Sequence, residues 1–129
     1  MPKIDAVFGP TNPPPDDGVQ RFGSVVGLRP DAEAQYRALH ANVWEGVVRR
    51  LRKSGIRNYS IFVTELDGKK FLFSYFEYHG HDLDADLAAI REDPETQRWW
   101  EETDPCQIRL PSTPSDQQWL PLERLFFSD

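Results

Sequence analysis

Apolar residues recur along the chain at two spacings, one typical of helices and the other of strands. Between residues 31 and 53, Val43, Val47 and Leu51 recur every four residues, which places them on one face of a helix. Gly55 then suits the left-handed position that follows the last turn of a helix. We therefore expect one continuous helix over residues 31–53.

Alternation of apolar and polar residues with a period of two predicts the strands. Asp67-Gly68 separates two of them, and this dipeptide is a strong signal for a tight hairpin. In the strand before the hairpin, Tyr59, Ile61 and Val63 fall on one face. The expected strands cover residues 21–28, 57–65, 70–79 and 118–127.

A second helical region follows the hairpin. Leu83, Leu87 and Ile90 recur at spacings of four and three residues, and Asp93-Pro94 opens a further helical segment. The order β-α-β-β-α-β predicts an α+β, ferredoxin-like fold with helices on one face of a four-stranded antiparallel sheet. Because the strands are rich in apolar residues on both faces, we expect a homodimer in which a second copy covers the open face, forming a dimeric α/β barrel.

The N-terminal stretch differs from the rest of the chain in composition. Four prolines lie between residues 10 and 15, where they remove backbone donors and fix φ. We expect residues 1–20 to form an extended or flexible arm, and residues 21–129 to form a single α+β domain.

Charge and composition argue against several classes of function. The 129 residues carry 15 basic and 21 acidic side chains, a net charge of −6, so the electrostatic footprint of nucleic-acid binding is missing. We expect a cytoplasmic protein, because no apolar run approaches a membrane span and the N-terminus lacks a signal-peptide core. The single Cys106 excludes an intrachain disulfide, and no set of residues at ligand spacing predicts a metal site.

Three aromatic residues at helical spacing are the first candidates for a functional site. Tyr36, His40 and Trp44 recur every four residues, so they share one face of the expected helix. Such a stripe is usually part of a core, yet a buried phenol or imidazole also needs a polar partner. Histidine titrates near neutral pH, so His40 can both donate and accept a proton. Either the three residues are packed and internally satisfied, or they line a cavity that holds something polar.

Trp99-Trp100 is a second candidate. Neighbouring residues on a helix point about 100° apart, so the two indoles cannot enter the same core position. Either one packs inward while the other covers a neighbouring element, or at least one offers its face and N–H to a sugar. The sequence favours neither interpretation. His79 and His81 are interpreted as part of a surface loop, because no third ligand joins them.

Taken together, these residues resemble the bacterial L-rhamnose mutarotases, which are small dimeric α+β proteins. The resemblance runs from about residue 21 to residue 127, and its specificity comes from the order and spacing of several short motifs. Where members of the family often read His-Asn-Pro, this chain reads His40-Ala41-Asn42, and its loop over residues 104–111 also differs. The motifs are Tyr36-x-x-x-His40-x-x-x-Trp44, Asn58-Tyr59-x-Ile61, Trp99-Trp100 and Glu123-x-x-Phe126.

The resemblance implies an activity and a set of site residues. His40 matches the proton donor of the family, and Tyr36, Tyr59, Trp99 and Trp100 match residues that contact the sugar. The family uses no metal or organic cofactor. The expected activity is that of an aldose 1-epimerase on a 6-deoxy-hexose, with L-rhamnose as the first substrate and L-fucose as the alternative.

Two hypotheses from other classes remain open. Cofactor-free monooxygenases with dimeric α/β barrels act on polycyclic aromatics, and an aromatic pocket would suit them. A non-catalytic sugar-binding or dimerisation module would bind the sugar without accelerating exchange between its anomers. The second hypothesis has less support, because a pure binding site does not need a titratable histidine such as His40.

Overall fold

The computed structural model describes residues 18–128, so most of the expected N-terminal arm lies outside the described residues. The strands are β1 (Gln20–Leu28), β2 (Ile56–Leu66), β3 (Lys69–Tyr78), β4 (Gln107–Ile108) and β5 (Leu120–Leu122). The helices are α2 (Glu33–Ala41), α3 (Glu45–Lys53), α4 (Leu83–Glu92) and α5 (Pro94–Thr103), with short 3₁₀ turns η1 (Pro30–Ala32) and η2 (Asp104–Cys106). No helix in this part of the chain is long and apolar enough to cross a membrane.

The strands form one antiparallel sheet. Its order is β2-β3-β1-β4, and β5 also pairs with β1. Asp67 and Gly68 join β2 to β3 as a two-residue turn, and both have positive φ (53° and 77°), as a type I′ turn requires. The first strand thus pairs with the third strand and with the C-terminal strands, which confirms the predicted hairpin and the α+β, ferredoxin-like class.

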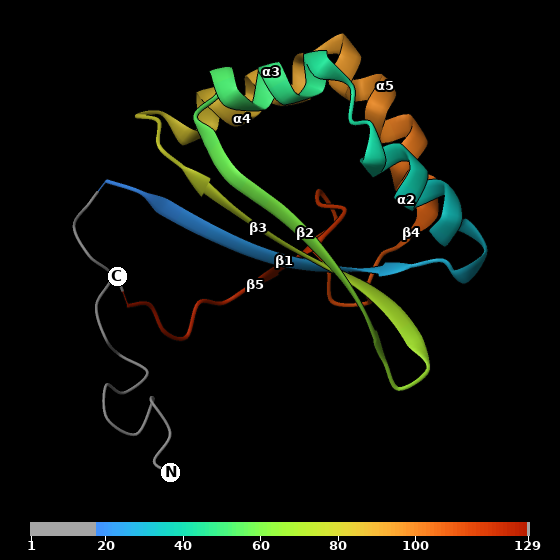
Figure 1. Cartoon of the computed structure of the whole chain (residues 1–129). Coiled ribbons are helices and arrows are strands. Elements are labelled where there is room, and N and C mark those ends of the chain that lie inside the picture. Colours follow the sequence, from blue (N-terminus) through green and yellow to red (C-terminus); the bar gives the residue numbers. More distant parts are fainter. Residues whose placement is uncertain (1–17, 129) are drawn as a thin grey trace.

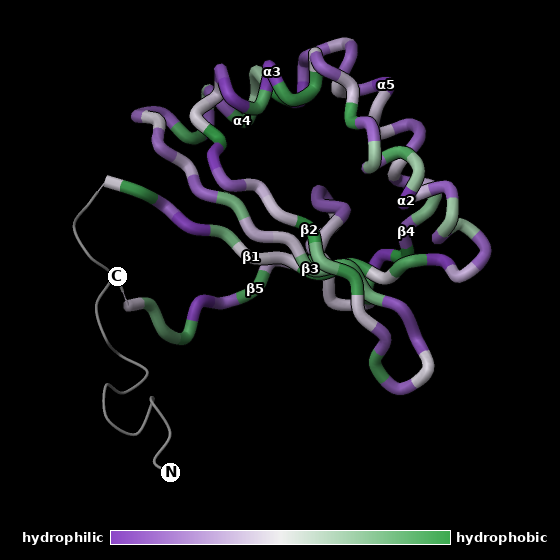
Figure 2. The backbone as a smooth tube through the Cα atoms, in the orientation of Figure 1, coloured by the Kyte–Doolittle hydropathy of each residue, from purple (hydrophilic) through white to green (hydrophobic). Residues whose placement is uncertain are grey.

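All four α-helices lie on one side of the curled sheet. Figure 1 shows α2 and α3 beside α5 and α4, arching over the sheet, and within residues 18–128 no helix covers the opposite face. In Figure 2 the hydrophobic segments of α3 gather on the side that faces the sheet, and the hydrophilic ones face outward. The apolar side of the helical arch therefore faces the sheet, and the buried core lies between these two layers.

The expected single helix over residues 31–53 is wrong, because the chain turns between α2 and α3. Asn42 leaves the helical region (φ −141°, ψ 68°), and Trp44 takes an extended conformation as the N-cap of α3. Asparagine and β-branched Val43 are both weak helix formers, and the turn brings the Trp44 ring 5.2 Å from the ring centroid of Trp99. Trp44 therefore leaves the helix face shared by Tyr36 and His40.

The predicted last strand is also shorter than expected. Instead of residues 118–127, only β5 is a strand there, and β4 lies within a stretch expected to be irregular. Both short strands pair with the same edge of β1, and Pro121 lacks the N–H that a longer ladder would use. At β4 the backbones approach closely, because a Cβ on Gly27 would lie 3.0 Å from the carbonyl oxygen and Cβ of Ile108.

Candidate active site

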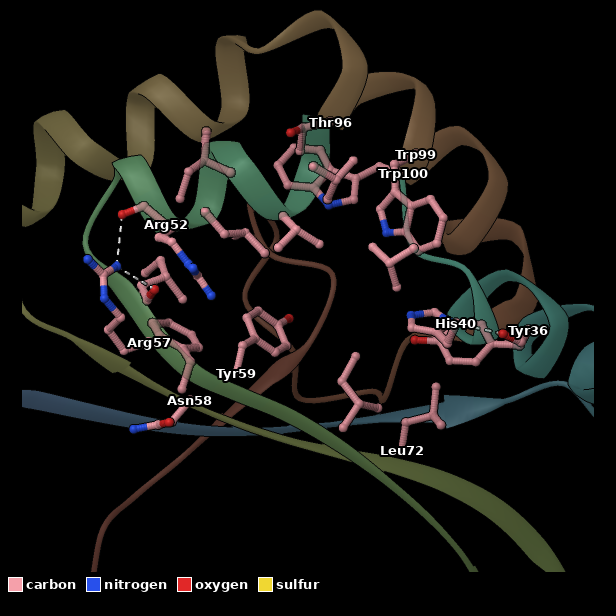
Figure 3. A pocket seen from close by; sticks show the side chains of 18 of the residues that line it. Tyr36, His40, Arg52, Arg57, Asn58, Tyr59, Leu72, Thr96, Trp99 and Trp100 are labelled. Carbon is pink, nitrogen blue, oxygen red and sulfur yellow. Dashed lines mark hydrogen bonds between the residues drawn. The ribbon is translucent and has the colours of Figure 1, made fainter. Parts of the chain in front are cut away.

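A cavity of about 940 Å³ lies between the helical arch and the sheet. Sites for small molecules typically occupy about 300–1,000 Å³, so this cavity lies at the upper end of that range. It borders two buried clusters, one containing Leu28, Tyr36 and Leu72 and the other containing Ile56 and Ile90. The cavity therefore separates the two parts of the core, and the residues at its two ends differ (Figure 3).

His40 lines the cavity from the last turn of α2. Its Nδ1 lies 2.9 Å from the backbone carbonyl oxygen of Tyr36. Because a carbonyl oxygen can only accept, Nδ1 donates in this hydrogen bond and carries a proton. Nε2 has no hydrogen-bond partner among residues 18–128. In the neutral ring, Nε2 is thus an unoccupied acceptor.

Aromatic rings hold the imidazole on two sides. The ring of Tyr36 stacks on His40 with centroids 4.2 Å apart and an interplanar angle of 28°. Trp99 meets the imidazole edge-on, with centroids 5.3 Å apart, and Trp44 in turn packs against Trp99. Together with the hydrogen bond at Nδ1, these contacts fix the orientation of the imidazole.

A pair of glutamine side chains positions the Tyr36 hydroxyl. Nε2 of Gln107 donates to this hydroxyl at 3.3 Å, and Nε2 of Gln118 donates to Oε1 of Gln107 at 3.1 Å. Tyr36 is only 4% exposed, and its burial raises the pKa of the phenol well above the usual value of 10.0. The phenol therefore stays protonated at neutral pH, and its own O–H remains a potential donor. The sequence analysis did not identify Gln107 or Gln118, because this contact joins residues 71 positions apart.

Tyr59 enters the cavity from β2 because of a β-bulge. The pairing of β2 with β3 shifts between Arg57 and Ser60, and Asn58 there has a positive φ of 52°. Tyr59 rises from the bulge into the cavity (Figure 3), so much of its 43% exposed surface faces that space. Its ring stacks on Phe76, and burial of its hydroxyl raises its pKa.

The two tryptophans of α5 both border the cavity. Asp93 caps this helix, because its side chain accepts from the Thr96 N–H at 2.9 Å and from the Thr96 hydroxyl at 2.7 Å. Trp99 is 6% exposed, whereas Trp100 is half-buried against the cluster around Ile90. All five predicted site residues therefore line this one cavity, namely Tyr36, His40, Tyr59, Trp99 and Trp100.

The other two histidines do not line the cavity. Nε2 of His79 lies 3.0 Å from the Glu77 carboxylate, and both His79 and His81 are exposed. Within residues 18–128 there is no group of three or more His, Cys, Asp or Glu side chains that could hold a metal ion.

Three arginines also line the cavity, and the sequence analysis did not assign them to the site. They are Arg37, Arg52 and Arg57, and no Asp or Glu lines the cavity with them. Arg52 lies in the last turn of α3, where a basic side chain also suits the negative end of the helix dipole, so its position in the sequence gives no sign of the cavity. Only the packing of α3 against β2 brings Arg52 and Arg57 together.

Known proteins resemble this chain in sequence and in fold. A sequence profile described as L-rhamnose mutarotase matches residues 21–127. The L-rhamnose mutarotase of Lactiplantibacillus plantarum is 35% identical over 88 residues, which cover 66% of this chain and 77% of the relative. That of Opitutus terrae is 35% identical over 80 residues, covering 62% of this chain and 72% of the relative.

A solved structure supports the fold. The crystal structure of an L-rhamnose mutarotase from Formosa agariphila superposes with a TM-score of 0.63, covering 85% of this chain and 99% of the other. Its sequence identity of 20% is low, so this likeness concerns the fold. The profile match extends over nearly the whole α+β region around the cavity. The chain belongs to the L-rhamnose mutarotase family, whose members are isomerases that act on carbohydrates.

Proposed function

We propose that this protein is an L-rhamnose mutarotase that interconverts the α and β anomers of the sugar, with His40 as a general acid–base group. The observation that carries the proposal is the environment of His40. Its ring is held by Tyr36 and Trp99, and its Nε2 is unoccupied at a cavity of suitable size. We take L-rhamnose as the substrate because the two relatives are named L-rhamnose mutarotases.

The reaction moves two protons and breaks one bond. As the ring opens, the anomeric hydroxyl loses its proton, the C1–O5 bond breaks, and protonated His40 delivers a proton from Nε2 to O5. The resulting aldehyde rotates about C1–C2. O5 then attacks the other face of C1, His40 recovers the proton from O5, and the first proton returns to O1. Each such proton transfer by a positioned group contributes about 10²–10⁴-fold to the rate.

The second proton acceptor is a water molecule or a tyrosine hydroxyl that bridges to water. Tyr36 fits the bridging role, because its oxygen accepts from Gln107 while its own proton is available. Because its pKa is raised by burial, the phenol relays a proton as a neutral group and does not ionise. The hydrogen bond at Nδ1 of His40 supports both its neutral and its protonated form, since Nδ1 donates in each.

The remaining four site residues are proposed to hold the sugar. Trp99 and Trp100 offer apolar faces to the C–H groups of a pyranose, and Tyr36 and Tyr59 offer hydroxyl groups to its O–H groups. An oxygen-dependent reaction or simple sugar binding would use the same surfaces, so the proposal depends on a measurement of rate.

The test is exchange between the two anomeric proton signals of L-rhamnose, measured by two-dimensional exchange NMR with and without the purified protein. We expect acceleration by the wild type, loss of acceleration in His40→Ala, and full activity in His79→Ala. The last variant is a matched control, because His79 is exposed and bound to Glu77 outside the cavity.

Four outcomes would contradict the proposal. Unchanged exchange in folded His40→Ala would remove His40 from the mechanism. Faster exchange with L-fucose than with L-rhamnose would change the substrate. Saturable binding with no acceleration, or oxygen uptake with a quinol substrate, would replace the reaction itself.

We also propose that the enzyme is a cytoplasmic homodimer. The sheet face opposite the helices carries Phe62, which is 61% exposed and lies directly opposite Phe73 in the strand register. A second copy would bury such a face. Light scattering on the purified protein would detect the dimer, and we expect Phe62→Glu to shift it toward the monomer. Cell fractionation would check the location.

A further inference from the structure

The end of the cavity opposite His40 is cationic, although the protein as a whole carries a net charge of −6. Arg52 and Arg57 stand together there, and Tyr59 lies between them and His40 (Figure 3). Since no carboxylate lines the cavity, its field favours a negatively charged ligand.

The basic cluster of α3, formed by Arg49, Arg50 and Arg52, has different partners at each of its members. Arg49 pairs with Glu45 at 2.9 Å, and Arg50 donates to the Ser54 hydroxyl at 3.0 Å and 3.1 Å. Among residues 18–128, Arg52 has no side-chain hydrogen bond or ion pair. Arg52 is thus the member of the cluster whose charge borders the cavity without a protein partner.

Arg57 is held in place without losing its charge. Its Nη1 donates to the backbone carbonyl oxygens of Arg52 at 2.8 Å and Ile56 at 2.9 Å, which caps the end of α3. Glu77 lies opposite Arg57 in the strand register but is bound by other groups, namely Asn58, Tyr75 and His79. The rest of the Arg57 guanidinium fork therefore remains available to a planar anion.

Arg37 contributes no free positive charge to the cavity. It donates to the Glu33 carboxylate at 2.9 Å, so its charge is neutralised within α2. The unneutralised positive charge of the lining is concentrated at Arg52 and Arg57.

We propose that Arg52 and Arg57 form a subsite for an anionic group, so that the enzyme also accepts a reducing sugar with a carboxylate or phosphate remote from its anomeric carbon. A 6-deoxy-hexose alone fills only part of a cavity of about 940 Å³, and cavities of this size hold larger ligands. Tyr59 lies between His40 and the arginines, so a ligand that occupies both ends of the cavity passes this ring. This inference rests on the proposed mutarotase activity.

The test compares three sugars by exchange NMR and by saturation-transfer NMR of binding: L-rhamnose, D-galacturonate as the carboxylate arm and D-glucose 6-phosphate as the phosphate arm. We expect at least one acidic sugar to bind more tightly than L-rhamnose and to exchange its anomers faster with enzyme than without. The preference falls by about tenfold in Arg52→Gln, because a charge-assisted hydrogen bond is lost at a partly exposed site. It also shrinks as NaCl rises from about 0.05 M to about 0.5 M.

The controls separate this subsite from the fold and from the catalytic step. Arg49→Gln removes a neighbouring arginine outside the cavity and should leave the ratio of acidic to neutral binding unchanged. Arg57→Gln also removes a helix cap, so Arg52→Gln is the deciding variant. Equal binding of acidic and neutral sugars, or a preference that survives in Arg52→Gln, overturns the subsite while leaving L-rhamnose exchange intact. Loss of exchange for every sugar overturns the proposed function instead, and the binding ratio still decides the subsite.

Discussion

At one end of the cavity His40 is held between the rings of Tyr36 and Trp99, whereas at the other end Arg52 and Arg57 are exposed. The His40 end fixes hydrogen positions: Nδ1 is committed to a carbonyl oxygen, and the Tyr36 hydroxyl is oriented by Gln107. The arginine end offers charge that water still reaches. In the proposed function and subsite, the first end therefore controls protons and the second attracts a charged substituent, since proton transfer needs fixed geometry and charge attraction does not.

The largest expected effect separates the two ends by kinetics. His40→Ala should lower kcat for anomer exchange by about 10²–10⁴-fold, because it removes a general acid–base group. Its KM should change much less, because other residues hold the sugar. Arg52→Gln should instead raise KM for an acidic sugar with a smaller change in kcat. If His40→Ala changed mainly KM, the division between the two ends would be wrong.

Tyr36→Phe should have the next largest effect. We expect kcat to fall by about tenfold and the free energy of unfolding to fall by about 1–3 kcal/mol, because the variant leaves a buried Gln107 donor without its partner. Rate measurements and denaturant titration would check these values. Tyr59→Phe is the matched control for Tyr36→Phe. The Tyr59 hydroxyl has no hydrogen bond to another residue within 18–128, so its removal should lower the free energy of unfolding little.

The raised pKa of Tyr36 also predicts the direction in which the free energy of unfolding changes at alkaline pH. Its folded-state pKa lies above the ordinary value of 10.0, so its stabilising contribution is complete below pH 10 and is lost as pH rises toward the folded pKa. The stability difference between wild type and Tyr36→Phe should therefore shrink above pH 10. A constant difference up to the alkaline limit would mean that the phenol is not shielded in solution.

Gln107→Leu should affect the His40 end alone. We expect kcat to fall several-fold, because the Tyr36 hydroxyl loses the donor that orients it, while the ratio of acidic to neutral binding stays unchanged. Gln117→Leu is a suitable control, because Gln117 is exposed and only its backbone takes part in hydrogen bonds. Equal effects of the two substitutions would show that the amide pair has no positioning role.

The smallest expected effect concerns the helix that carries the tryptophans. Thr96 hydrogen bonds hold the pKa of Asp93 below its ordinary value of 3.8, so this cap stabilises the fold above pH 3.8 and its contribution is lost as pH falls through the lower folded-state pKa. Asp93→Asn keeps a capping oxygen but removes the charge. We expect its Tm to lie a few degrees below that of the wild type at pH 6 and the difference to vanish in acid. Calorimetry across this range would check it.

Local signals predicted much of the fold correctly. Asp67-Gly68 specifies a hairpin because the turn demands two residues with positive φ, and Gly55 ends α3 with a φ of 82° for the same reason. The break after α2 escaped prediction because Trp44 continues the four-residue spacing of Tyr36 and His40. No glycine or proline marks the turn, and its stabilising contact with Trp99 is distant in sequence.

The site was predictable to the extent that its chemistry is carried by rare residue types. An imidazole and an indole pair are uncommon enough to attract attention, and all of them line the cavity. Gln107, Gln118, Arg52 and Arg57 are ordinary surface residue types, and their sequence gives no hint of their partners. Their roles depend on which strand edge β4 joins and on how α3 lies over β2, and only the tertiary structure provides this information.

The bulge in β2 shifts the alternation of side chains between the two faces of the sheet by one residue. Before it, Ile56 faces the helices; after it, Ile61 and Val63 do, although straight alternation would place these odd-numbered residues on the other face from Ile56. Asn58 lies at the bulge in a left-handed conformation, which asparagine is among the few side chains to tolerate. If the same residues paired with β3 without the bulge, straight alternation would place Ile56 and Tyr59 on opposite faces of the sheet. The extra residue that the bulge accommodates is therefore as much a part of the site as the identity of its tyrosine.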